Sequence, residues 1–259
     1  MGIDQFQDVI QQKANELYRT MPWREDTRPY YVLVSELMLQ QTQVARVIPK
    51  FEAFIDAFPS EKELAAASLG DVLIHWQGLG YNRRAKFLYE AAKEIVRLGF
   101  FPDTKEALIK LPGVGKNTAG AILAYSFNQP SIFIETNIRT VYIHHFFNDQ
   151  FDIDDNQLIE LLEQTIDHER PREFYWALMD YGSWLKSNGV RNISSSKHYK
   201  KQPPLAGSIR EMRGMIIRNL SNNVDLDELK VDPRFDQAVD SLTRDGMITM
   251  VTDNIKLTK

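Results

Sequence analysis

One carboxylate stands inside an otherwise apolar stretch near the N-terminus. Residues 31–44 read YVLVSELMLQQTQV, with Glu36 as the one acid, and no basic residue follows until Arg46. If a helix buries this carboxylate, desolvation raises its pKa and keeps it protonated near neutral pH, as a general acid requires. From periodicity alone, a Glu36 side chain that faces water is the preferred interpretation, so the chemistry depends on how the helix is placed.

A second stretch suits contact with phosphate groups. Residues 111–120 read LPGVGKNTAG, in which Pro112 ends one helix and the glycines permit a tight turn before the next. The free N–H groups that open the second helix can then approach a DNA phosphate without an intervening side chain. This spacing is typical of a helix-hairpin-helix DNA-binding turn and is rare in ordinary glycine-rich connectors. The expected contacts are Gly113, Gly115, Lys116, Asn117 and Thr118.

Positive charge gathers in one segment although the chain as a whole is acidic. The net charge is −4, yet residues 181–210 contain no Asp or Glu. Such a segment can meet phosphates while the remaining surface repels them, and a solvated polar loop is the alternative. Its basic residues are Lys186, Arg191, Lys197, Lys200, Lys201 and Arg210.

Composition and cysteine usage exclude several classes of protein and site. The content of 43% hydrophobic and 25% charged residues is ordinary for a folded protein, and no run approaches the roughly 20 apolar residues of a membrane span. The chain has no cysteine, which excludes disulfides, thiolate zinc sites and cysteine-ligated iron–sulfur clusters. We expect a cytoplasmic protein without membrane attachment and without a metal site.

Nearly all periodic segments predict helices, so the expected fold class is mainly α. Pro171, for example, fits the first position of an amphipathic helix. After a Ser-, Lys- and Pro-rich linker at 188–207, further helices precede the segment MITMVTDNIKLT, which predicts a hairpin turning at Asp253-Asn254. Three helices and a hairpin predict a small winged-helix-like domain over 208–259.

Several motifs resemble, in the expected order, those of the MutY-like adenine DNA glycosylases. The motifs are Pro22-Trp23-Arg24, SELMLQQTQV from Ser35, GLGYNRRA from Gly78 and LPGVGKNTAGAI from Leu111. The resemblance covers residues 22–185 and implies a helix-hairpin-helix glycosylase fold. In that fold 1–22 and 134–187 pack together as one helical domain. Residues 23–133 form a six-helix barrel that carries the hairpin.

The resemblance implies a role for two acids. Glu36 corresponds to the proton donor that protonates adenine at N7, after the base has left the helical stack, while the sugar becomes oxocarbenium-like. A second carboxylate faces this cation, and Glu135 stands where the family has Asp, two residues before Asn137. The longer side chain either keeps the role after local rearrangement or marks a weakened or repurposed enzyme.

Further positions match residues that contact the substrate in the family. Gln41, Leu79 and Tyr81 match residues inserted into the duplex around the lesion, with Thr42 expected beside them. Arg24 matches a residue near the flipped base. Core packing is the alternative for each position, and the preferred one for Leu79.

Two departures from related enzymes concern covalent and metal chemistry. Asn117 stands where the endonuclease III enzymes have a Schiff-base lysine, which predicts a monofunctional hydrolase without lyase activity. The family's four cluster cysteines would fall between about Lys186 and Gln202, and all are absent. This is the basic segment, which predicts that 188–207 replaces the cluster loop and keeps its DNA contact. No cofactor is expected, and an alkali ion at the hairpin is left open.

The leading hypothesis is an adenine DNA glycosylase that acts as a monomer, associated with the nucleoid, on double-stranded DNA containing adenine mispaired with 8-oxoguanine or guanine. A thymine or uracil mismatch glycosylase is a second hypothesis, and a non-catalytic helix-hairpin-helix DNA-binding protein is a third. The residues after 207 are too few for the β-rich domain with which the family senses oxidised guanine. The preferred opposite base is therefore not predicted.

Overall fold

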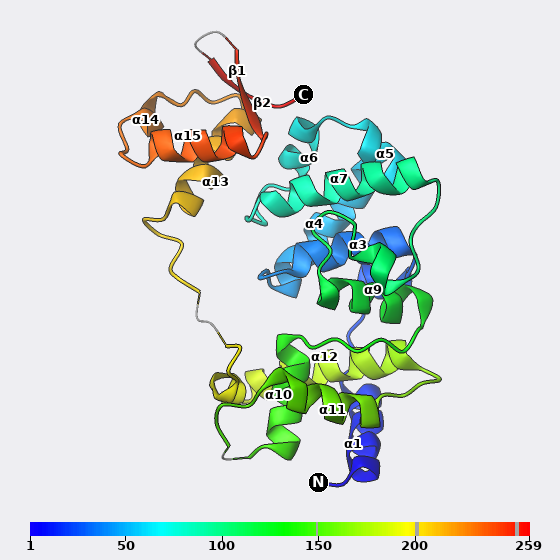
Figure 1. Ribbon diagram of the computed structural model, residues 1–259. Helices are drawn as coiled ribbons and strands as arrows, with labels where there is room; N and C mark the ends of the chain where they lie inside the picture. Colours follow the sequence, from blue (N-terminus) through cyan, green and yellow to red (C-terminus); the bar gives the residue numbers. More distant parts are fainter. Residues whose placement is uncertain (149, 200–201, 252–253) are drawn as a thin grey trace. The chain divides into compact units, whose positions relative to one another are not determined.

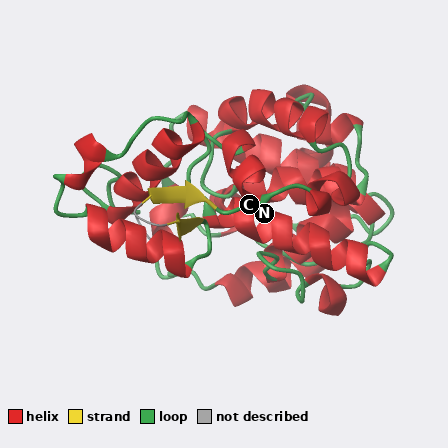
Figure 2. Cartoon of the chain, turned by 90° about the horizontal axis from the view of Figure 1, so that it is seen from above, coloured by secondary structure: helices red, strands yellow, loops and turns green. Residues whose placement is uncertain are grey.

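The computed structural model describes residues 1–148, 150–199, 202–251 and 254–259, and most of them are helical (Figure 1, Figure 2). This confirms the predicted mainly α fold class with a small sheet near the C-terminus. In these ranges no helix has both the length and the apolar character that crossing a membrane would require. The elements are α1 (Ile3–Leu17), α2 (Pro22–Glu25), α3 (Pro29–Leu39), α4 (Val44–Ala57), α5 (Glu61–Ala66), α6 (Leu69–His75), α7 (Arg83–Leu98), α8 (Lys105–Leu108), α9 (Lys116–Phe127), α10 (Thr136–Phe146), α11 (Asp155–Thr165), α12 (Pro171–Ser187), the 3-10 helix η1 (Asn192–Ser195), α13 (Ile209–Ser221), α14 (Asp227–Lys230), α15 (Phe235–Arg244), β1 (Ile248–Val251) and β2 (Asn254–Leu257).

Contacts divide the chain into two compact units. Unit 1 comprises Met1–Val32, Asp103–Lys110 and Val114–Lys201, and unit 2 comprises Leu33–Pro102, Leu111–Gly113 and Gln202–Lys259. This division differs from the predicted boundaries at 133 and 207. In unit 1, α9 packs on α12, and in unit 2, α13 packs on α6. These contacts place α9 in unit 1 together with α12. They place the C-terminal segment in unit 2 together with the helices after residue 32.

Unit 1 is built around α1, α10 and α12. Phe6 of α1 lies with its ring centroid 5.0 Å from that of Tyr142 on α10. α12 begins at Pro171, as predicted. It approaches α10 so closely that a Cβ added at Gly182 would lie 2.4 Å from the carbonyl oxygen of Asn137. Only glycine allows the two helices to meet at this distance.

The C-terminal segment consists of three helices and a hairpin, as the sequence predicts. β1 and β2 are antiparallel, and Ile248 pairs with Leu257 while Val251 pairs with Asn254. Asp253 of the predicted turn lies outside the described residues, and Asn254 already belongs to β2. The amide of Gly70 in α6 donates to the carbonyl of Thr258 at 2.8 Å, which ties the end of the chain to α6 within unit 2.

We expect one partly buried histidine in unit 1 to make the free energy of unfolding depend on pH. The Nε2 atom of His145 lies 3.0 Å from the Tyr181 hydroxyl, and burial lowers the pKa of His145 to about 4, with the charges of His144 and the N-terminus acting in the same direction. The unfolded chain, with an ordinary histidine pKa of about 6.5, binds this proton more readily. The free energy of unfolding should therefore fall as the pH drops from about 6.5 to about 4. Urea unfolding across this range should give a shallower pH slope for His145→Gln.

The exposed His168 provides the control for this prediction. His168→Gln should keep the pH slope of the parent protein. An equal slope in His145→Gln and the parent would show that His145 does not cause the acid sensitivity.

Candidate functional site

The predicted hairpin is present between α8 and α9. Gly113 has φ +77°, and a Cβ there would lie 2.6 Å from Cβ of Phe87, so the turn requires glycine for both conformation and space. Gly115 occupies the N-cap of α9, and no side chain caps this end. The first-turn amides are therefore free to bind an anion, with the positive end of the helix dipole behind them. Lys116 is exposed beside these amides, whereas Thr118 is buried.

Asn117 joins this helix start to the segment that carries Glu135. Its Nδ2 atom donates to the carbonyl oxygen of Ile134 at 2.7 Å. One turn further along α9, a Cβ added at Gly120 would lie 2.8 Å from Cβ of Phe133. The 133–135 segment is thus held directly against α9. Asn117 therefore acts here as a positioning residue for the residue that precedes α10.

Glu135 stands at the N-cap of α10 and makes no capping hydrogen bond with its side chain. The residue is partly exposed, yet burial of its carboxyl group raises the pKa of Glu135, and the positive charge of Arg139 opposes this effect. Arg139 is fixed by two hydrogen bonds to Asp155, at 2.9 and 2.7 Å. Among the described residues, nothing donates to the buried Oδ1 of Asn137. This corner offers a carboxylate and an amide oxygen, both suited to a positively charged group.

Glu36 lies in the middle of α3, as predicted. Its neighbours Leu33, Val34, Leu37 and Met38 are fully buried, while Glu36 itself is half-buried. The helix therefore does not turn this side chain fully to water. Its role as a proton donor and its raised pKa stay predictions.

A buried guanidinium in unit 2 connects the end of α3 to the loop before α7. Arg84 donates from Nη1 to the carbonyl oxygens of Leu37 and Met38, at 2.8 Å each, and of Gln40 at 2.6 Å. From Nη2 it donates to those of Leu79 and Gly80, at 3.0 Å each. Burial lowers the pKa of Arg84 to about 10, which leaves it charged at neutral pH. The cation satisfies carbonyl groups that the C-terminus of α3 cannot bond internally.

The residues expected to enter the duplex lie on either side of this guanidinium. Gln41 and Tyr81 adopt left-handed backbone conformations, with φ +60° and +48°. Such conformations are unfavourable for residues other than glycine and gather at functional sites. Thr42 accepts a hydrogen bond from Arg84 at 3.2 Å. Leu79 is 4% exposed, so its side chain packs in the core in this state.

Arg24 belongs to a buried ion pair in unit 1. It binds Asp180 of α12 through Nη1–Oδ2 at 2.7 Å and Nη2–Oδ1 at 3.0 Å, and the rings of Tyr18 and Trp176 lie over the guanidinium. Arg19 shares the same carboxylate at 2.7 Å. This pairing explains why Arg24 is buried. The role of Arg24 near a flipped base stays a prediction.

Hydrogen bonds join the basic segment to residues 140 and 153 of unit 1. The Ile153 amide donates to the carbonyl of Ser195 at 3.0 Å, the Lys197 amide donates to that of Ile153 at 3.1 Å, and Asn192 Nδ2 donates to that of Thr140 at 3.0 Å. Arg191 and Lys197 are exposed, Lys186 is partly buried, and Lys200 and Lys201 lie outside the described residues.

The segment does not fit the family's iron–sulfur cluster, because its thiolate ligands are missing. Within the ranges that the structure describes, no cluster of three His, Asp or Glu residues could hold a metal ion either. Main-chain hydrogen bonds fix this loop instead.

Comparison with known proteins assigns the family. The model of the HhH-GPD superfamily of base excision DNA repair proteins matches residues 34–167. An adenine DNA glycosylase of Mycobacterium tuberculosis is 30% identical over 91% of this chain and 88% of its own length. One from Buchnera aphidicola (strain Bp) is 40% identical over 69% of this chain and 52% of its own length. The chain belongs to the HhH-GPD superfamily, and it spans about half the length of the Buchnera relative.

Solved structures show the same fold. A thermostable thymine-DNA glycosylase has a TM-score of 0.63 and 24% identity, and covers 70% of this chain and 86% of its own. A trapped endonuclease III–DNA covalent intermediate has a TM-score of 0.57 and 16% identity, and covers 80% of this chain and 93% of its own. At these identities the likeness concerns the fold alone.

Sequence reasoning missed three positions that shape these sites. Arg84 lies inside the GLGYNRRA motif, where a basic residue in an apolar register was the available signal. Asp180 is a single acid on the buried face of α12. Gly182 interrupts the same helix, and an interior glycine, which costs about 1 kcal/mol against alanine, indicates a close approach.

Replacing Arg84 by lysine should destabilise unit 2 although the charge is kept. An ammonium group cannot reach the five carbonyl oxygens, and buried carbonyls without a partner cost about 1–3 kcal/mol each. We expect Arg84→Lys to lose about 3 kcal/mol or more of unfolding free energy, measured by urea denaturation. Arg83→Lys is the matched control, because Arg83 is exposed and pairs with Asp245. Equal stabilities of the two variants would contradict this account.

Proposed function

We propose that this protein is an adenine DNA glycosylase that hydrolyses the N-glycosidic bond of adenine mispaired with 8-oxoguanine or guanine. The observation that carries the proposal is the double use of α9. Its uncapped N-terminus offers amides to a phosphate, and Asn117 in its first turn holds the segment before Glu135. In this proposal α9 binds the DNA backbone and also positions the Glu135 carboxylate toward the same strand.

The proposed reaction divides the work between two acids. Glu36 transfers a proton to N7 of the flipped adenine, and the C1′–N9 bond then breaks with its electron pair going to the neutral base. The sugar becomes an oxocarbenium-like cation, which an ionised Glu135 stabilises electrostatically. Water adds at C1′ and gives up a proton to a carboxylate. The products are free adenine and an abasic site.

The relatives and the chemistry of the chain support this assignment. The mycobacterial relative, which this chain matches over most of its length, is an adenine DNA glycosylase by name. Asn117 cannot form a Schiff base, so the proposed enzyme is a hydrolase without lyase activity. We further propose that it works as a monomer and without an iron–sulfur cluster, since the chain supplies no thiolate.

The function is tested by incubating the protein with duplexes that differ in one mispair. Adenine opposite 8-oxoguanine or guanine should yield alkali-labile abasic sites, and adenine opposite thymine should not. Strand cleavage without alkali should be absent. Cleavage at thymine or uracil opposite guanine instead would identify a mismatch glycosylase of another specificity. Tight DNA binding without any abasic product would identify a non-catalytic DNA-binding protein.

The variant Glu36→Gln should lose base removal and keep its affinity for mispaired duplexes. General acid catalysis contributes about 10²–10⁴ in rate, so the single-turnover rate should fall by at least about a hundredfold. The exposed Glu52 on α4 is the control, and Glu52→Gln should keep the rate. A Glu36→Gln variant with a near-normal single-turnover rate would remove Glu36 from the mechanism.

A further inference from the structure

A cavity of about 810 Å³ lies within unit 2, and the C-terminal segment forms one of its walls. The opposite walls are the loop at Gln41-Thr42 and the loop at 77–83, which carry residues expected to contact DNA. The wall from the C-terminal segment consists mainly of α13. The charged residues that line the cavity are mostly basic. They are Arg46, Arg83, Arg210, Arg213 and Arg218, together with the acidic Glu211.

Some of these charges are neutralised by partners and some are not. Arg83 and Arg213 share the carboxylate of Asp245, at 2.8 and 2.7 Å. The side chains of Arg46 and Arg218 have no hydrogen-bond or ion-pair partner among the described residues, and Arg218 is exposed. Among the described lining residues, the cavity therefore keeps an excess of positive charge.

Arg210 takes part in a stack of cations and an aromatic ring. Its guanidinium donates to the Tyr81 hydroxyl at 2.8 Å and lies 5.0 Å from the ring centroid. Arg84 lies 5.4 Å from the same centroid. Aromatic rings beside cationic side chains are a common arrangement for binding a nucleic-acid strand, with the base on the ring and the phosphate on the cation.

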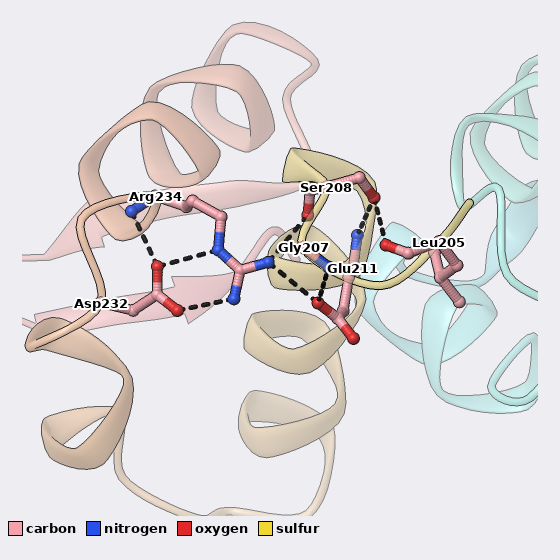
Figure 3. A network of polar contacts seen from close by, with 6 residues as sticks. All are labelled: Leu205, Gly207, Ser208, Glu211, Asp232 and Arg234. Carbon is pink, nitrogen blue, oxygen red and sulfur yellow. Dashed lines mark hydrogen bonds and ion pairs between the residues drawn. The ribbon is translucent and has the colours of Figure 1, made fainter. Parts of the chain in front are cut away.

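A network of polar contacts fixes the start of α13 and hence the position of Arg210 (Figure 3). Ser208 caps the helix by accepting from the Glu211 amide at 3.2 Å, and the Glu211 carboxylate accepts from the Gly207 amide at 2.9 Å. Arg234 binds both Glu211, at 2.9 Å, and Asp232, at 2.6 Å. Glu211, the one acid in the lining, is therefore already paired.

The charge on α15, the other long helix of the C-terminal segment, differs from that on α13. In helix-turn-helix proteins a later helix usually enters the major groove. Here the exposed side of α15 carries Asp236 and Asp240, which would repel phosphates. The charge pattern thus favours α13, and not α15, as the helix that meets DNA.

We propose that Arg46, Arg210 and Arg218 in this cavity bind the phosphates of a DNA strand. The C-terminal segment is then a second DNA-binding element beside the hairpin. This inference rests on the proposed function only in taking repair-substrate DNA as the ligand. In the complex Arg210 exchanges the Tyr81 hydroxyl for a phosphate.

The test compares arginines inside and outside the cavity in the 259-residue chain. Affinity for an undamaged duplex is measured between 50 and 200 mM NaCl for Arg46→Ala, Arg218→Ala and Arg244→Ala. Arg244 is exposed on α15 and does not line the cavity. Each lost phosphate contact lowers the slope of log affinity against log salt by about 0.9. We expect this change for Arg46→Ala and Arg218→Ala, and an unchanged slope for Arg244→Ala and for the charge-preserving Arg218→Lys.

The outcomes separate this inference from the proposed function. An unchanged slope in Arg46→Ala and Arg218→Ala, or an equal decrease in Arg244→Ala, would overturn the cavity as a DNA site. Because binding to an undamaged duplex needs no base removal, the slopes are informative even if no mispair is cleaved. Lower slopes without glycosylase activity would support the cavity and reject the enzyme.

Discussion

The Arg84 guanidinium joins the two loops of unit 2 that carry the residues expected to enter the duplex. A helix leaves its last carbonyl groups without internal partners, and α3 ends with such groups directly before Gln41. A planar cation with several donors satisfies them and at the same time bonds the carbonyls of the 79–80 loop. These bonds offset the unfavourable backbone of Gln41 and Tyr81, each of which costs on the order of 1–3 kcal/mol.

In unit 1, α9 likewise has two structural roles. The turn before this helix needs Gly113 for its left-handed conformation, and the uncapped first turn leaves amides for an anion. Asn117 then transmits the position of the helix to Glu135 through a single hydrogen bond. In the basic segment, main-chain hydrogen bonds between Ile153 and residues 195–197 close the loop. Backbone pairing requires no thiolate, which is consistent with a cysteine-free chain.

The sequence predicted features that depend on local chemistry. The start of α12 at Pro171, the hairpin glycines and the pairing of β1 with β2 follow from the preferences of a few adjacent residues. The ion pair of Arg24 with Asp180 was missed because its partners are 156 positions apart, and local patterns do not show which distant residues pair. The division into two units likewise depends on contacts between helices that are distant in the sequence. Packing of α9 on α12 and of α13 on α6 is a matter of tertiary contact and not of composition.

The substitution of Glu for the family's Asp at position 135 decides whether this account describes a working enzyme. The segment before this carboxyl group is held by α9, and the group is not used as a helix cap. Burial raises the pKa of Glu135, and the positive charge of Arg139 opposes this effect. The most direct measurement is the single-turnover rate of adenine release from a duplex with adenine opposite 8-oxoguanine, for the parent protein, Glu135→Asp and Glu135→Gln. We expect release by the parent and by Glu135→Asp, with a loss of at least about a hundredfold in Glu135→Gln because the sugar cation loses its counter-charge. Equal rates for the parent and Glu135→Gln would contradict this expectation.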